Sequence, residues 1–173
     1  MKKISGIIAF LAFGTLWISA QSAPATAAQS APFSLKVSTT AEQFRLGAAI
    51  NLQISLTNTS GRKIYVQRAN GGLAEAEFDV FAKDDSGVSA PESSYYRVLK
   101  GRPPRDSSEP KFIVRYSFQV VAAQPGESLQ SSIDLSKIFD FDRQGKYNVW
   151  VVRNDSASKS RVKSNVITVV ISQ

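Results

Sequence analysis

Cationic side chains that could recognise an anionic partner are concentrated in one window of the chain, from Arg97 to Arg115. The window also holds Gly101 and the pair Pro103 and Pro104, which favour a long loop between two strands. Because a rigid scaffold commonly presents recognition residues on loops, we predict that this loop binds an anionic partner. The alternative is a solvated loop whose charges keep the domain soluble. The candidate binding residues are Arg97, Lys100, Arg102, Arg105, Lys111 and Arg115.

A second, smaller cationic group flanks the last expected hairpin loop, residues 154–160. We interpret this group as the soluble tip of a hairpin, because charged residues commonly protect exposed strand ends. Its members are Arg153, Lys159, Arg161 and Lys163.

Carboxylates offer two further kinds of chemistry. Asp134, Asp140 and Asp142 surround an expected helical turn, and such oxygen ligands suit calcium, but their spacing lacks a complete calcium loop. Aspartate is also a routine turn and helix-cap residue. Glu75 and Glu77 are two residues apart on an expected strand, and general acid–base chemistry with such a pair would also need a substrate cleft. We therefore expect no catalytic residue, no metal site and no cofactor.

Two absences exclude whole classes of protein. Among 173 residues there is no Cys and no His, so a disulfide framework, a thiol nucleophile, a Ser-His-Asp hydrolase and a Cys/His zinc enzyme are excluded. The 21 basic residues against 14 acidic ones give a net charge of +7, which favours anionic partners. The aromatic residues lack the spacing of a base-stacking platform, so we do not expect nucleic-acid binding.

The N-terminal residues have the order of an export signal. Met1 to Lys3 is basic, the following residues are apolar, and small residues end the segment near Ala20. An uncleaved anchor is the alternative, because the apolar run is close to spanning length. We predict a signal peptide at residues 1–20, a flexible leader at 21–32 and one domain at 33–173, located in a periplasm or outside the cell. No later segment is apolar enough to span a bilayer, and we expect a monomer.

The rest of the chain has a hydrophobic period of two, which predicts β-strands. The clearest strand is Ile50 to Leu56, where four apolar residues alternate with polar ones. Residues 136–139 are expected to form one helical turn. The expected strands are 33–37, 50–56, 64–66, 78–82, 95–99, 112–120, 129–135, 147–151 and 166–171.

Eight or nine short strands without long helices predict an all-β antiparallel sandwich. Tyr147 enters a late strand directly after a glycine turn, which is where a tyrosine corner of an immunoglobulin-like fold occurs. An ordinary hairpin tyrosine is the alternative.

The residues that carry a family resemblance are spread along the domain: Ile50 to Ser60, Gln124 to Gly126, Asp134 to Ser136, Gly145 to Tyr147, and Ser164 with Asn165. In this order they resemble immunoglobulin-like domains of secreted bacterial proteins. Similar patterns occur in the intracellular proteinase inhibitor family and in domains that accompany deuterolysin-like metallopeptidases. The resemblance implies an immunoglobulin-like sandwich and a role near proteolysis. No catalytic residue carries over, because the His-bearing metal motif of the peptidases is absent.

Together these observations predict an exported, non-enzymatic interaction domain. Its expected partner is a protein or an anionic component of the cell envelope, bound through the loops. The alternative function is that of a proteinase inhibitor or a peptidase-associated domain.

Overall fold

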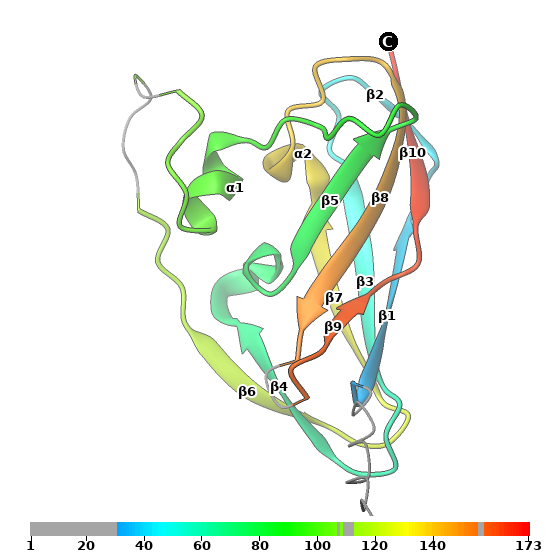
Figure 1. The fold of residues 1–173 in the computed structure, drawn as a ribbon, viewed down its shortest axis with the longest axis vertical. Coiled ribbons are helices and arrows are strands. Elements are labelled where there is room, and N and C mark those ends of the chain that lie inside the picture. Colours follow the sequence, from blue (N-terminus) through cyan, green and yellow to red (C-terminus); the bar gives the residue numbers. More distant parts are fainter. Residues whose placement is uncertain (1–30, 107, 109–112, 156–157) are drawn as a thin grey trace, which may run out of the picture.

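The computed structural model of the chain describes residues 31–106, 108, 113–155 and 158–173 (Figure 1). The expected signal peptide and most of the leader therefore lie outside the described residues. The described part is built mainly of strands, with the helices α1 (Ser94–Leu99) and α2 (Leu135–Ile138) and short 3₁₀ turns at Asn70–Gly72 and Ala74–Ala76. The strands are β1 (Phe33–Thr39), β2 (Gln43–Arg45), β3 (Asn51–Asn58), β4 (Ile64–Ala69), β5 (Asp79–Asp84), β6 (Phe118–Ala123), β7 (Ser128–Asp134), β8 (Gly145–Asn154), β9 (Arg161–Lys163) and β10 (Ile167–Ser172).

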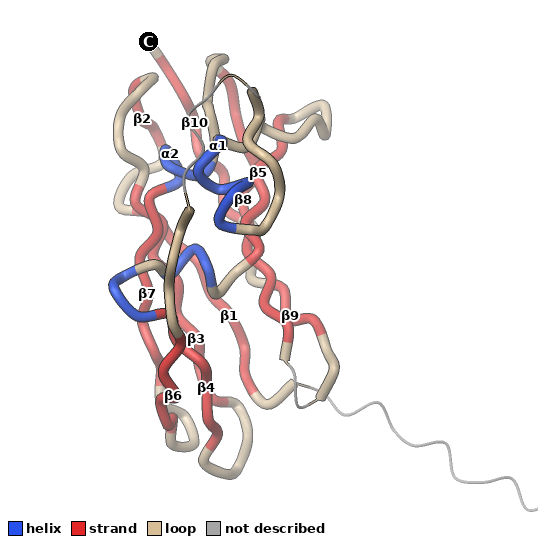
Figure 2. Tube along the Cα trace, turned by 90° about the vertical axis from the view of Figure 1, so that its left-hand side faces the viewer, coloured by secondary structure: helices blue, strands red, loops and turns tan. Residues whose placement is uncertain are grey.

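These strands form three sheets. One has the order β1-β3-β7, the second has the order β2-β10-β8-β5 with β9 also paired to β8, and the third is the two-stranded ribbon β4-β6. All pairings are antiparallel except that of β10 with β2. The expected all-β class is thus confirmed. Figure 2 shows α1 and α2 near one end of the molecule and the β4-β6 ribbon toward the other.

Alternating apolar residues place the core between the two larger sheets. On β3 the side chains of Leu52 and Ile54 are fully buried, and the intervening Gln53 is exposed. The register puts Leu52 opposite Ile133 of β7. The buried residues of β8, among them Val149, belong to the same core cluster. The predicted inward face of residues 50–56 is confirmed.

Two expected local features have matching hydrogen bonds, one at the end of β7 and one at the start of β8. Asp134 accepts the Ser136 amide at 3.0 Å and caps α2, so the expected helical turn is present, one residue earlier than expected. The Tyr147 hydroxyl donates to the Arg143 carbonyl at 3.0 Å, which is the hydrogen bond that a tyrosine corner requires.

The strand expected at residues 95–99 is wrong, because this segment is helix α1. Ser93 caps the helix by accepting the Tyr96 amide at 3.2 Å, and that cap satisfies an amide that a helix otherwise leaves unpaired. Tyr96 and Leu99 are buried, three residues apart on the inner face of the helix. A helix of this length has too few residues for its period to be distinguished from that of a strand.

The long strand expected at residues 112–120 is also corrected. The described residues 113–117 are not in a strand, and β6 begins only at Phe118. The pairing with β4 determines this boundary, because the register ends where Ala69 faces Phe118. The Val120 side chain on this strand is 65% exposed.

Three further differences concern short elements. Glu75 lies in a 3₁₀ turn and Glu77 directly follows it, so the two carboxylates do not share a strand. The strands β2 and β9 were missed, because three residues are too few to show a period of two. With them the described part has ten strands, where eight or nine were expected. Among the described residues, none of the helices has the length and apolar character needed to cross a bilayer.

Candidate functional site

Among the described residues, the outer face of the β4-β6 ribbon carries the most exposed large apolar side chains on paired strands. The register places Tyr65, Val120 and Phe118 on the same side of the ribbon. Their exposed fractions are 72%, 65% and 46%. The ring of Tyr116 contacts the Phe118 ring edge-on, with 5.4 Å between centroids. We call this surface the ribbon face.

A groove lies between β4 and the end of β8. Figure 1 shows the ribbon below the lower end of β8. The groove has a volume of ≈ 620 Å³. We call it the ribbon groove. It is lined by Pro32, Phe33, Arg62, Lys63, Ile64, Tyr65, Val66, Gln67, Val120, Arg153, Asn154 and Asp155.

A buried ionic network holds the ribbon in place beside the groove. The Glu77 side chain is only 1% exposed and lies 2.9 Å from both the Arg68 and the Arg153 guanidinium groups. Its carboxylate also accepts the Ala69 amide at 2.9 Å. Arg153 donates to the Gln67 carbonyl of β4, and Arg68 donates to Ser131 of β7 at 2.8 Å. Polar contacts therefore tie β4 to both larger sheets.

The network leaves the groove cationic. Burial lowers the pKa of the Arg153 guanidinium, and the hydrogen bond and charge of Glu77 oppose that shift. One carboxylate between two guanidinium groups leaves a positive charge uncompensated. Arg62 and Lys63 add cationic side chains at the groove, and Asp155 is its one acidic lining residue. An anionic group would therefore be attracted to this groove.

A second hollow, of ≈ 190 Å³, extends the ribbon groove toward α1. The two share Gln67, Arg153 and Asn154 in their linings, and the second adds Lys100 and Phe118. The Lys100 ammonium donates to the Phe78 carbonyl at 2.7 Å and lies 3.3 Å from the Asp79 carboxylate, and its burial lowers its pKa. One residue of the predicted basic loop thus lies on this surface.

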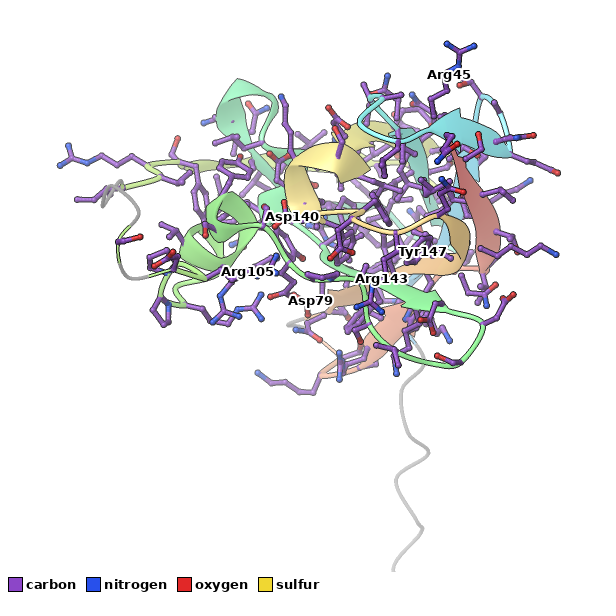
Figure 3. All side chains as sticks on the ribbon, turned by 90° about the horizontal axis from the view of Figure 1, so that it is seen from above. Arg45, Asp79, Arg105, Asp140, Arg143 and Tyr147 are labelled. Carbon is purple, nitrogen blue, oxygen red and sulfur yellow. The ribbon has the colours of Figure 1, made fainter. Side chains whose placement is uncertain are left out.

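Three other residues of the predicted loop form ion pairs near α1. Arg102 lies 2.7 Å from Glu92, and Arg97 lies 3.9 Å from the same carboxylate. Arg105 lies 2.9 Å from Asp140, and Figure 3 shows their side chains next to each other. Their charges are partly neutralised within the chain.

The remaining two members of the predicted loop are separate from those ion pairs. Lys111 lies outside the described residues. Arg115 is exposed in the segment that precedes β6. The structure therefore gathers Arg97, Arg102 and Arg105 around α1, brings Lys100 to the second hollow, and leaves Arg115 beside the ribbon.

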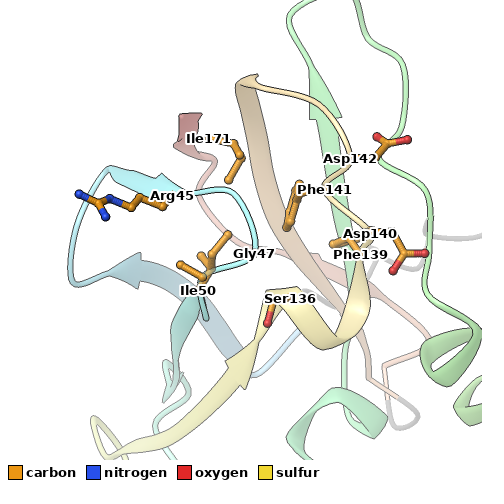
Figure 4. Close-up of a pocket in the computed structure, with 10 residues that line it drawn as sticks. Arg45, Gly47, Ile50, Ser136, Phe139, Asp140, Phe141, Asp142 and Ile171 are labelled. Atoms are coloured by element: carbon orange, nitrogen blue, oxygen red, sulfur yellow. The ribbon is translucent and has the colours of Figure 1, made fainter. Parts of the chain in front are cut away.

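A third hollow, of ≈ 310 Å³, lies near the aspartates that follow α2. Figure 4 shows Phe139, Phe141 and Ile171 around it, with Asp140 and Arg45 at opposite sides. Charged groups at opposite sides do not converge on one ligand. Within the described residues, no three His, Cys, Asp or Glu side chains gather in a metal-binding group.

The two glutamates considered for acid–base chemistry have separate partners. Glu75 accepts the Tyr95 hydroxyl at 2.6 Å, whereas Glu77 binds the two arginines. Burial, followed by the neighbouring Glu75, raises the pKa of Tyr95 well above its usual range. The phenol therefore stays protonated and donates to Glu75. The expectation that the two carboxylates point the same way from one strand is therefore wrong.

The ribbon face was not predicted from the sequence. Arg153 was expected at a soluble hairpin tip, but it is only 9% exposed. One signal was available. Around Tyr65 the neighbours Ile64 and Val66 are apolar as well, and Val120 is followed by Val121, so both ribbon strands carry apolar residues on both faces. When one face of such a strand packs on a core, its other apolar face remains exposed to solvent.

Comparisons with known proteins identify no family. No family model matches the sequence, and no curated protein matches it. Similar solved structures include a β-glucosidase from Listeria innocua (17% identity, TM-score 0.39) and the alkylpurine DNA glycosylase AlkC of Pseudomonas fluorescens (12% identity, TM-score 0.41). The alignments cover 82% and 83% of this chain, but only 16% and 31% of those proteins. At these TM-scores the likeness supports no argument about fold family or function.

Proposed function

We propose that this protein is an exported, non-enzymatic interaction domain that binds a protein partner at the ribbon face and ribbon groove. The observation that carries the proposal is the exposure of Tyr65, Val120 and Phe118 on paired strands next to a cationic groove. Contiguous exposed apolar side chains rimmed by polar ones mark interaction sites on proteins. Aromatic residues and arginine are also the residue types enriched at such interfaces.

The scaffold in this proposal is an immunoglobulin-like sandwich. The hydrogen bond from Tyr147 to the Arg143 carbonyl supports it, because that contact defines a tyrosine corner. The sheets β1-β3-β7 and β2-β10-β8-β5 contribute to one core, as two packed sheets of a sandwich do. In such domains, edge strands and loops are free to bind while the core stays rigid.

The proposed partner is anionic where it meets the groove. Arg62, Lys63 and Arg153 support this, and Lys100 extends the cationic surface into the second hollow. This surface includes one residue of the basic loop predicted from the sequence. A protein is favoured over an envelope polymer, because the ribbon face offers apolar contact area that a charged polymer would not use.

Site-specific photo-crosslinking tests the proposed surface. A benzophenone amino acid at Tyr65 in the full-length chain, expressed with its own N-terminal residues, should give a discrete crosslinked protein after irradiation of intact cells. Val88 is the matched control, because it is 62% exposed in the turn after β5 and away from the ribbon groove. Identical crosslinking patterns from Tyr65 and Val88 would argue against a binding site at the ribbon.

Two measurements address the remaining parts of the proposal. Export predicts that protein recovered from outside the cytoplasm begins between Gln21 and Ser30, which mass spectrometry of the N-terminus can read. A retained Met1 in the membrane fraction would favour the anchored alternative. A panel of purified proteases tests the inhibitor alternative, since dose-dependent inhibition would replace a general binding role with that one.

A further inference from the structure

Among the strands that the structure describes, β4 pairs only with β6, and β6 pairs only with β4. The other edge of β4 therefore carries no described strand. The ribbon groove lies along the other side of β4. An unpaired strand edge presents backbone donors and acceptors that another extended chain can use.

Observed contacts show which residues of β4 point their backbone groups at the groove. On the β6 side, the Asn70 amide donates to the Ser117 carbonyl at 2.8 Å. On the opposite side, the Ala69 amide donates to Glu77 and the Gln67 carbonyl accepts from Arg153. Backbone direction alternates along a strand, so the odd-numbered residues of β4 face away from β6.

Tyr65 follows the same alternation. Its amide and carbonyl, and the Gln67 amide, therefore face the groove, and none of the three takes part in a hydrogen bond with another described residue. These groups belong to residues two apart on the same edge of β4. An added strand has its donors and acceptors at the same spacing. At the far end of β4, the Gln67 carbonyl and the Ala69 amide are already hydrogen-bonded to Arg153 and Glu77. The part of the edge that is open to a partner is therefore the segment near Tyr65.

The charges beside this edge select an acidic occupant. Arg62 and Lys63 directly precede β4 and line the groove. Arg153 lies across the groove, and its positive charge is only partly neutralised because the Glu77 carboxylate also pairs with Arg68. In an extended segment, alternate side chains point to opposite faces. One set would meet these cations, and the other would meet the exposed Tyr65 and Val120.

Two other occupants fit these observations less well. The chain's own residues 21–32 end at Pro32, which lines the groove, but this segment includes no acidic residue. A second copy paired along β4 would bring Arg62, Lys63 and Arg68 of both copies together, and like charges opposed at an interface are unfavourable. An acidic segment of a different protein would supply the negative charge and would avoid placing like charges opposite each other.

We propose that the free edge of β4 takes up an extended, acidic segment of a partner protein as an additional strand. The inference rests on the proposed function, and it specifies the partner's chemistry and its mode of binding. Backbone hydrogen bonds to Tyr65 and Gln67 would give affinity, and the cations around the groove would give specificity.

Defined peptides test this proposal with the full-length protein. The probe is a capped eight-residue peptide of alternating Val and Glu, and its control has Lys in place of every Glu. We expect the acidic peptide to bind at least tenfold more tightly at low salt, with the preference shrinking at 1 M salt, where the Debye length is about 3 Å. Hydrogen exchange should slow at the Tyr65 and Gln67 amides. The Val66 amide serves as an internal reference because it faces β6.

Two variants at one position isolate the backbone donor. Gln67→Pro removes the amide hydrogen at the free edge and leaves the carbonyl that accepts from Arg153, and proline is tolerated on edge strands. Gln67→Ala removes the same side chain but keeps the amide. We expect the proline variant to bind the acidic peptide at least tenfold more weakly than the alanine variant. If the proline variant fails to fold, Lys63→Glu at an exposed site should weaken acidic-peptide binding and improve basic-peptide binding.

Several outcomes would overturn the proposal. Equal binding of the two peptides, no acidic-peptide binding at millimolar concentration, or equal affinity of the two Gln67 variants would each exclude acidic strand addition. Binding that appears only after deletion of residues 21–31 would assign the edge to the chain's own segment. A dimer with protected Tyr65 and Gln67 amides in the absence of peptide would assign it to a second copy. A protein crosslink at Tyr65 alongside negative peptide results would leave the proposed function standing and reject only this mode of binding.

Discussion

Strands β3 and β6 are both rich in apolar residues but have opposite environments. On β3 the side chains of Leu52 and Ile54 are fully buried, because β3 lies between β1 and β7 and faces the second large sheet across the core. On β6 Phe118 and Val120 are 46% and 65% exposed, and among the described strands β6 pairs only with β4. Alternation therefore defines the two faces of a strand, and the neighbours decide which face is covered.

The two regions also differ in what holds them. The core around β3 is stabilised by removing apolar surface from water. The ribbon is attached both through the charges of Arg68, Glu77 and Arg153 and through Ile64 and Val66, which pack inward. A surface held by directed polar contacts can keep its other face free for a partner.

The largest expected effect is in the core. Leu52→Ala should lower the free energy of unfolding by roughly 2 to 5 kcal/mol, through lost burial and a residual cavity. Val120→Ala on the ribbon should change it by no more than about 0.5 kcal/mol, as is usual for surface substitutions. Urea unfolding of the two variants measures the difference, and Gln53→Ala on the exposed face of β3 is the control. Equal losses for Leu52 and Val120 would remove the distinction between the regions.

The next effect concerns the ionic network. Glu77→Ala should cost about 3 kcal/mol, because it leaves the largely buried Arg153 without its carboxylate. Hydrogen exchange at the Ala69 amide, which donates to Glu77, should increase more than exchange on β3. Asp79→Ala is the matched control, since its carboxylate is 43% exposed beside Lys100. A Glu77 variant as mild as the Asp79 variant would show that the network does not hold the ribbon.

Alkaline pH provides a third comparison. Burial raises the pKa of Tyr96, whose hydroxyl accepts the Val80 amide at 2.9 Å. Above pH 10 the tyrosine of the unfolded chain loses its proton first, so the unfolded state binds fewer protons and stability falls as pH rises. The slope should approach about 1.4 kcal/mol per pH unit for this one group. Lys100 opposes the loss, because burial lowers its pKa and the folded chain releases its proton earlier.

Substitution isolates the contribution of Tyr96. In Tyr96→Phe the alkaline loss of stability should become shallower, although the variant starts from a lower stability at neutral pH. Chemical denaturation between pH 8 and 11 tests this. A slope unchanged in Tyr96→Phe would trace the alkaline loss to other groups.

The smallest stability effect is expected in the predicted basic loop. Replacing Arg102 and Arg105 together with Ser should change the free energy of unfolding by no more than about 1 kcal/mol per ion pair, because both pairs are well exposed. Thermal melting measures this, and the Tyr65 crosslink should persist. Loss of the crosslink with unchanged melting would show that the binding surface extends from the ribbon groove onto the loop.

Much of the scaffold was predictable because its signals are local. The alternation of Ile50 to Leu56 predicted both β3 and its buried face. Asp134 predicted a cap, and Tyr147 predicted a corner, because each makes its defining hydrogen bond within four residues. Such contacts depend on neighbours that are adjacent in the chain, so residue types and spacing suffice to find them.

Other features could not be read in this way. Residues 95–99 and 112–120 both show apolar spacing, yet one forms helix α1 and the other starts β6 only at Phe118. The extent of β6 depends on a partner strand about fifty residues earlier in the chain. The candidate site also changed, since most of the cations singled out by sequence form ion pairs near α1, and Lys100 alone among them lines the second hollow.

The chain's residue types and periods were sufficient to specify an all-β class, the buried faces of the central strands and a cationic surface. Tertiary structure alone decided that Arg153 is buried against Glu77, that Tyr65 and Val120 remain uncovered, and that one edge of β4 stays open. The physical reason is the distance along the chain between the residues that interact. Period and capping arise from neighbours along the chain, whereas burial, charge pairing and free strand edges depend on which distant segments pack together.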